Sequence, residues 1–197
     1  MKYLKLFESF NKSEIDKICR KYDIRNYTIN TDGSIDVNGD DTLLYGGVGL
    51  GIMDLKKLPL KFNKVDGWFN CNFNMMKSLE GSPIEVNGDF NCVGNELTSF
   101  KFAPRIIRGD FYCSSNYIKT FEYFPKFVKG DFYCIGNRIY QVWRLFEDWT
   151  KIELLNDFDI FRDEDTDEPV IVMERLNDFL LTIGKDPVKK VYFYKNI

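Results

Sequence analysis

Three aspartates recur at an interval of 21 residues, at Asp89, Asp110 and Asp131. Carboxylates stacked on neighbouring strands repel one another unless something neutralises them, and oxygen ligands of this kind are those that Ca²⁺ prefers. Arg108 and Lys129 each stand two residues before an aspartate and offer a simpler compensation. We therefore interpret the aspartates as solvated or ion-paired carboxylates, and we expect no metal site.

Four cysteines follow the same interval, and the chain contains no C-x-x-C pair and no histidine. This spacing is not that of a zinc site, and imidazole ligands are excluded, although composition alone leaves a four-thiolate site open. Small buried hydrophobic side chains are the simpler interpretation, and it extends to Cys19 on the apolar face of an early helix. We expect no cofactor. The four cysteines are Cys71, Cys92, Cys113 and Cys134.

The absence of histidine also removes the commonest general base and the partner of most catalytic nucleophiles. An enzyme would depend on carboxylates, lysine, tyrosine or cysteine alone. The alternative that stays open is a carboxylate-dependent hydrolase that uses the repeated aspartates or Glu147 and Asp148. Such an enzyme needs a pocket that brings unlike carboxylates together, whereas the repeated aspartates are equivalent. We expect the chain not to be an enzyme.

The interval of 21 residues belongs to a longer repeat, which begins at Gly67, Gly88, Gly109 and Gly130. Phenylalanine and cysteine alternate with polar residues after each glycine, so both point to one face of a short strand, which we expect to be the interior. An asparagine follows each cysteine by three residues, and we expect it to bond backbone groups that a tight turn leaves unpaired. A proline closes each turn. The columns are Phe69, Phe90, Phe111 and Phe132; Asn74, Asn95, Asn116 and Asn137; Met76, Leu97, Ile118 and Ile139; Leu79, Phe100 and Phe121; Pro83, Pro104 and Pro125.

The repeat resembles the short bacterial type of leucine-rich repeat, in which "N-x-L-T-S-L" is followed by a proline turn. The matching segments are "NELTSF" at Asn95 and "NMMKSLEGSP" at Asn74. The resemblance covers residues 53–140; the phenylalanines, the cysteines and the Gly-Asp before each strand depart from the usual pattern. It extends to repeat proteins of tailed bacteriophages. It implies an α+β protein with a leucine-rich-repeat-like parallel β solenoid of about four 21-residue turns.

The outward residues of the expected strands form a surface suited to a protein partner. Tyrosine and tryptophan carry a large contact area together with a polar group, and solenoids commonly bind partners along such a face. The candidate partner-binding residues are Trp68, Asn70, Asn91, Tyr112, Tyr133, Asp89, Asp110 and Asp131.

Residues 1–52 are expected to cap the first turn of the repeat. Ser13 precedes an amphipathic pattern and predicts a helix start, and Asp32-Gly33 between alternating residues predicts a β-hairpin. The glycine-rich "YGGVGLG" at residues 45–51 matches no phosphate-binding motif. Because Gly39 precedes Gly67 by 28 residues instead of 21, we interpret this stretch as a seven-residue insertion that could serve binding.

Residues 141–197 are expected to form a C-terminal α/β cap. Apolar spacing predicts helices over residues 142–149 and 172–183, the acidic run at 162–169 predicts a solvated loop, and residues 191–197 predict a final strand.

Composition indicates a soluble, cytoplasmic protein. The formal net charge of −3 and scattered cations predict no nucleic acid partner, and no stretch approaches the ~18 apolar residues of a membrane span. The expected function is noncatalytic binding of another protein; the bacteriophage resemblance implies a host or defence protein in the cytoplasm of an infected bacterium. The alternative is sequestration of a small ligand by the glycine-rich insertion or the C-terminal cap, which a deep apolar cavity there would favour.

Overall fold

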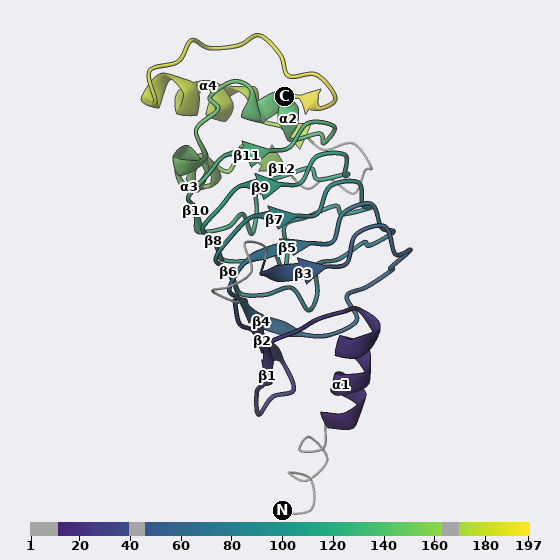
Figure 1. The fold of residues 1–197 in the computed structure, drawn as a ribbon. Coiled ribbons are helices and arrows are strands. Elements are labelled where there is room, and N and C mark those ends of the chain that lie inside the picture. Colours follow the sequence, from purple (N-terminus) through teal and green to yellow (C-terminus); the bar gives the residue numbers. More distant parts are fainter. Residues whose placement is uncertain (1–11, 40–45, 163–169) are drawn as a thin grey trace, which may run out of the picture.

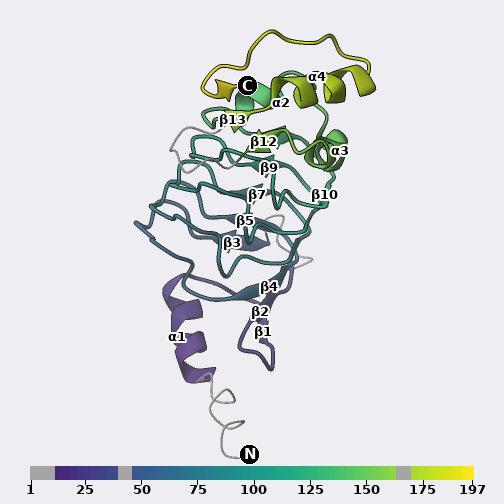
Figure 2. The ribbon, with the colours of Figure 1, turned by 180° about the vertical axis from the view of Figure 1, so that it is seen from behind.

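The computed structural model describes residues 12–39, 46–162 and 170–197. It is an α+β structure of parallel sheets with few helices (Figure 1). Helix α1 lies at one end and helices α2, α3 and α4 at the other, with the sheets between them (Figure 2). The helical elements are α1 (Lys12–Lys21), α2 (Tyr140–Trp143), the 3₁₀ helix η2 (Trp149–Lys151), α3 (Ile152–Asp157) and α4 (Met173–Thr182).

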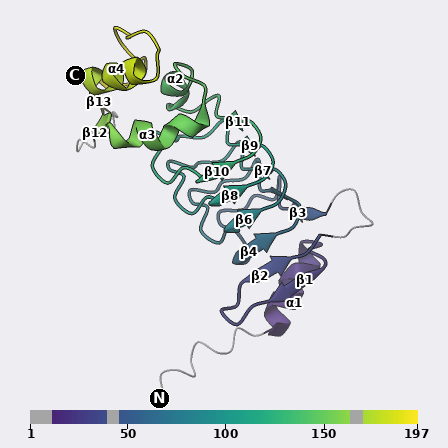
Figure 3. The same cartoon turned by 90° about the vertical axis from the view of Figure 1, so that its left-hand side faces the viewer.

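Two sheets run side by side along the molecule (Figure 3). The first has the order β1-β2-β4-β6-β8-β10 and the second β11-β9-β7-β5-β3; apart from the β1–β2 hairpin, every pairing in them is parallel. The first sheet contains β1 (Tyr27–Ile29), β2 (Ile35–Val37), β4 (Phe62–Val65), β6 (Glu85–Val86), β8 (Ile106–Ile107) and β10 (Phe127–Val128). The second contains β3 (Gly47–Gly49), β5 (Trp68–Asn70), β7 (Phe90–Asn91), β9 (Phe111–Tyr112) and β11 (Phe132–Tyr133).

The register of the second sheet follows the sequence repeat. Phe69 pairs with Phe90, Phe90 with Phe111, and Phe111 with Phe132, each partner 21 residues further along the chain. Their rings lie 5.4 to 5.7 Å apart between centroids, a favourable distance for aromatic pairs. The prediction that the phenylalanines and the four repeat cysteines point inward is confirmed, because all of them are buried.

The repeated asparagines bind the backbone, as predicted. Asn95 is 5% exposed; its Nδ2 donates to the carbonyls of Cys71 (3.0 Å) and Cys92 (3.1 Å), and its Oδ1 accepts from the N–H of Met76 (3.1 Å). One asparagine therefore bonds its own turn and the preceding one. Asn74, Asn116 and Asn137 make the same set of bonds in their own turns.

The glycine-rich stretch is not an insertion over its described part, and this prediction was wrong. Residues 47–49 form strand β3, in register with β5: Gly47 pairs with Trp68 and Val48 with Phe69. Val48 and Leu50 are buried in the columns that phenylalanine and cysteine fill in later turns. The regular pairing of the second sheet therefore begins before residue 53, and residues 40–45 lie outside the described part of the chain.

The N-terminal end follows the prediction in outline. The β1–β2 hairpin turns at Asp32 and Gly33, and Gly33 adopts a φ of 78° that a glycine tolerates. Helix α1 already includes Ser13, which therefore lies within the helix instead of preceding it.

The C-terminal end differs from the prediction where one helix was expected over residues 142–149. Helix α2 ends at Trp143, Glu147 takes a φ of 50°, and Asp148 caps η2 by accepting from the N–H of Thr150 (3.0 Å). The helix expected over 172–183 is confirmed as α4.

The last part of the chain contributes a third sheet. It pairs β12 (Phe161–Arg162), β13 (Val170–Ile171) and β14 (Lys195–Asn196), so the expected final strand is confined to two residues. Most of the predicted acidic loop, residues 163–169, lies outside the described residues. Buried residues from α1 through α4 form one continuous apolar core.

Candidate functional site

The predicted partner-binding residues lie together on the outer face of the second sheet. Asn70 pairs with Asn91, Asn91 with Tyr112, and Tyr112 with Tyr133, so these four form one column across β5, β7, β9 and β11. A parallel column at the start of the strands holds Trp68, Asp89, Asp110 and Asp131. We call these eight residues the strand face.

Two tyrosines dominate the C-terminal half of the strand face. The rings of Tyr112 and Tyr133 stack with centroids 4.8 Å apart and planes 3° from parallel. Their hydroxyls donate to Oδ2 of Asp110 (2.7 Å) and Asp131 (3.2 Å). The hydrogen bond to Asp110 raises the pKa of Tyr112 to about 12, and the bond to Asp131 raises the pKa of Tyr133. The pair is thus an ordered, partly exposed aromatic platform.

The negative charges of the three aspartates are not compensated by Arg108 and Lys129, contrary to the prediction from the sequence. Oδ1 of Asp89 accepts from the backbone N–H of Asp110 (2.8 Å), and Oδ1 of Asp110 accepts from that of Asp131 (2.8 Å). Arg108 instead pairs with Glu85 on the first sheet (3.0 Å), and no ion pair joins Lys129 to an aspartate within the described residues. Backbone N–H groups therefore hold the carboxylates of Asp89 and Asp110 in place.

Trp68 and the two asparagines are partly engaged by their own neighbours. A Cβ placed on Gly47 would lie 2.6 Å from the Trp68 ring, so the indole lies directly on strand β3. Oδ1 of Asn70 accepts from the N–H two residues later (3.0 Å), as does Oδ1 of Asn91 (3.1 Å). The asparagine NH₂ groups donate no hydrogen bond within the described residues and remain available to a partner.

The other residues considered for chemistry do not converge. Asp148 is occupied by the cap of η2, and Glu147 lies in the adjacent turn. Burial raises the pKa of the thiols of Cys92 and Cys113 well above the usual value. Within residues 12–39, 46–162 and 170–197, no group of three or more cysteines, aspartates or glutamates is placed to hold a metal ion.

The chain matches no protein-family model, no curated protein and no solved structure. In the part of the chain that the structure describes, no helix has the length and apolar character needed to cross a bilayer.

Sequence reasoning missed a second surface on the other side of the sheets. A groove of about 1540 Å³ runs past α1 and along successive turns, where it meets Leu60, Gly81, Phe102 and Tyr123. These four residues follow one another at intervals of 21, so the repeat was a signal that could have revealed this column. Among the described residues, the groove touches neither the glycine-rich stretch nor residues 141–197, the two places proposed for a small ligand.

Proposed function

We propose that this chain is a noncatalytic protein-binding module, a leucine-rich-repeat-like parallel β solenoid whose strand face recognises another protein. The observation that carries the proposal is the stacked pair of Tyr112 and Tyr133, each with its hydroxyl fixed by an aspartate of the same strand region. A pre-organised aromatic platform loses little conformational entropy on binding, and tyrosine is enriched among the residues that dominate interface energies.

The charge of the strand face indicates the chemistry of its partner. Asp89, Asp110 and Asp131 form an acidic row beside the tyrosines. Backbone N–H groups hold the carboxylates of Asp89 and Asp110 in place, and the Tyr133 hydroxyl binds that of Asp131. A basic patch of the partner would therefore meet an ordered row of carboxylates. We therefore propose a partner that presents lysine or arginine next to apolar groups.

Two observations favour binding over hydrolysis. The repeated aspartates have similar surroundings, since each accepts a hydrogen bond from a backbone N–H or a tyrosine hydroxyl of the same sheet, whereas acid–base catalysis by two carboxylates requires unlike surroundings. Glu147 and Asp148 belong to the C-terminal cap and not to the strand face. From the bacteriophage resemblance, we propose a host or defence protein of an infected bacterium as the class of partner.

The experiment is affinity capture from bacterial lysate with the intact chain and with the double variant Tyr112→Ala, Tyr133→Ala. Tyr117→Ala is the matched control, because Tyr117 is 62% exposed and lies outside the strand face. Circular dichroism establishes that all three proteins fold. We expect the intact chain and the control to capture a protein from the lysate that the double variant does not capture. The captured amount should fall as the salt concentration is raised. Equal retention by all three proteins would contradict the proposal.

A further inference from the structure

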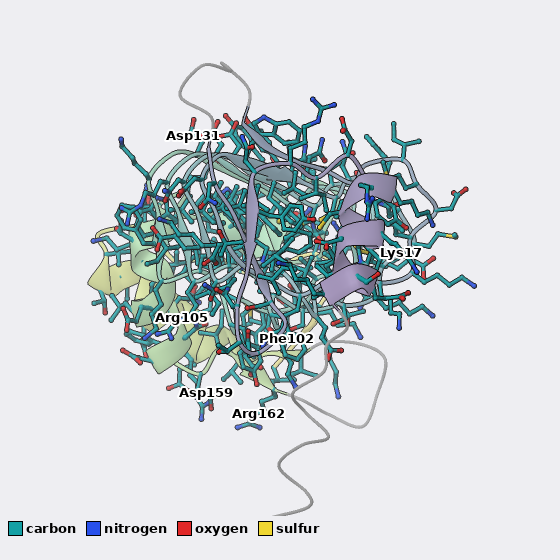
Figure 4. All side chains as sticks on the ribbon, turned by 60° about the horizontal axis from the view of Figure 1, so that its bottom comes forward. Lys17, Phe102, Arg105, Asp131, Asp159 and Arg162 are labelled. Atoms are coloured by element: carbon teal, nitrogen blue, oxygen red, sulfur yellow. The ribbon has the colours of Figure 1, made fainter. Side chains whose placement is uncertain are left out.

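The groove on the far side of the sheets is lined by exposed aromatic side chains that recur at the 21-residue interval and that packing does not explain. Figure 4 shows Phe102 and Arg105 on the side of the molecule opposite to Asp131 of the strand face. Both residues line the groove, together with Tyr123 and Lys126, their counterparts one turn further along. The two surfaces are therefore separate.

Gly81, Phe102 and Tyr123 share one position in three successive turns and one backbone conformation. Their φ angles are 92°, 68° and 61°, in the left-handed region that disfavours bulky side chains. Gly81 shows that the turn itself needs no side chain. Yet the next two turns place aromatic rings there, and these are 49% and 63% exposed. Ile52 and Phe73 combine a left-handed backbone with an exposed side chain elsewhere in the chain, so it is the position of Phe102 and Tyr123 in the groove that sets these two rings apart.

Two cations stand beside these aromatic residues. Arg105 and Lys126 are exposed, occupy equivalent positions one turn apart, and form no ion pair within the described residues. Ile84, at the same position one turn earlier, is 53% exposed and also lines the groove. This end of the groove thus combines apolar contact area with two uncompensated positive charges.

The acidic lining residues lie mainly at the other end. Glu14 belongs to α1, and Asp32 lies in the β1–β2 turn, where it is paired with Lys61. Lys56, Lys57 and Lys61 line the groove near these acidic residues, so the charge there is mixed. An anionic ligand would therefore be attracted to the end beside Arg105 and Lys126, which form no ion pair within the described residues.

We propose that this end of the groove binds an extended acidic segment of another protein. Carboxylates of the segment would pair with Arg105 and Lys126, and its apolar side chains would lie against Ile84, Phe102 and Tyr123. A peptide is favoured over a nucleic acid because acidic residues, Glu80 among them, also line the groove, and the chain carries a net charge of −3. The site goes beyond the proposed function, since it lies on another face and takes a ligand of opposite charge.

The test is a selection of binders from a displayed library of random peptides, with the full chain as bait. We expect one class of peptides that combine aspartate or glutamate with aromatic or aliphatic residues. Their affinity, measured by fluorescence anisotropy, should fall about tenfold or more in Arg105→Gln, Lys126→Gln, because two interfacial charge pairs are lost. Lys129→Gln is the matched control, because Lys129 is exposed and does not line the groove.

A second variant, Phe102→Gly, Tyr123→Gly, removes the rings and gives the two turns the residue that Gly81 already has. It should fold and should also bind the acidic peptides about tenfold more weakly or worse. If this variant fails to fold, the charge variant alone decides. Failure to select acidic peptides, or acidic peptides that bind both variants unchanged, would overturn the proposal.

Two further outcomes separate this site from the alternatives. Labelled oligouridylate that binds the groove more tightly than the selected peptides would overturn the proposal in favour of single-stranded nucleic acid. A selection that yields only basic peptides sensitive to Tyr112→Ala, Tyr133→Ala would refute the groove and support the strand face, so the two proposals fail independently.

Discussion

Replacing Asn116 by alanine removes a side chain that joins two turns of the sheet. Asn116 is 3% exposed, donates to the carbonyls of Cys92 and Cys113 (both 3.0 Å), and accepts from the N–H of Leu97 (3.0 Å). Each such bond contributes about 1 kcal/mol net, and buried groups left without a partner add a penalty of about 1 to 3 kcal/mol. We expect the free energy of unfolding to fall by about 3 to 5 kcal/mol.

The assay is urea unfolding followed by far-UV circular dichroism, with the slope of the transition compared between variants. Asn91→Ala is the matched control, because Asn91 is half-buried and its side chain makes one bond, to the N–H of Val93 (3.1 Å). The control should lose no more than about 1 kcal/mol. A loss below about 1 kcal/mol for Asn116→Ala would refute the view that these asparagines hold the turns together.

Three further predictions follow from contacts described above. Gly47→Ala would place a methyl group 2.6 Å from the Trp68 ring. We therefore expect a red shift of tryptophan fluorescence and a fall of about 2 kcal/mol or more in the free energy of unfolding. An unchanged fluorescence spectrum would contradict the close contact. Because burial raises the pKa of the Cys113 thiol, alkylation of the native protein at pH 8 should leave Cys113 unmodified by mass spectrometry, whereas the urea-unfolded chain is modified there. The pKa of Tyr112 is about 12 in the folded chain and about 10 in the unfolded chain, so its hydrogen bond to Asp110 contributes its full stabilisation below pH 10. This stabilisation is lost as the pH rises through about 12. In Asp110→Ala, the NMR signal of the Tyr112 ring carbons should titrate closer to pH 10.

The sequence repeat was sufficient to predict the second sheet, because identical residues at one spacing leave a single register that buries the phenylalanine column, Phe69, Phe90, Phe111 and Phe132. It was also sufficient for the asparagine bonds, since a buried amide between strands has few partners other than the backbone. Strand β3 was missed because Val48 and Leu50 replace phenylalanine and cysteine, and the flanking glycines resemble a loop.

Predictions from the sequence failed where packing or backbone conformation determines the local structure. The end of α2 at Trp143 could not be anticipated, because Leu145 and Phe146 continue a helical spacing. For the candidate site, the columns of the strand face were evident, but not the aspartate bonds to the next turn. The exposed aromatic rings of Phe102 and Tyr123 were missed because apolar residues before a proline do not reveal a left-handed turn.

The asparagine bonds have a consequence for how the gene for this chain can change. Each asparagine of a turn bonds only that turn and the one before it, so Asn116 makes toward Cys92 and Leu97 the bonds that Asn95 makes toward Cys71 and Met76. Loss of one whole unit would let Asn116 take over the role of Asn95, with every neighbour of the same kind. In-frame duplication or deletion of a unit would therefore lengthen or shorten the strand face and the groove together without introducing a new kind of contact, and length variants of this protein should remain foldable.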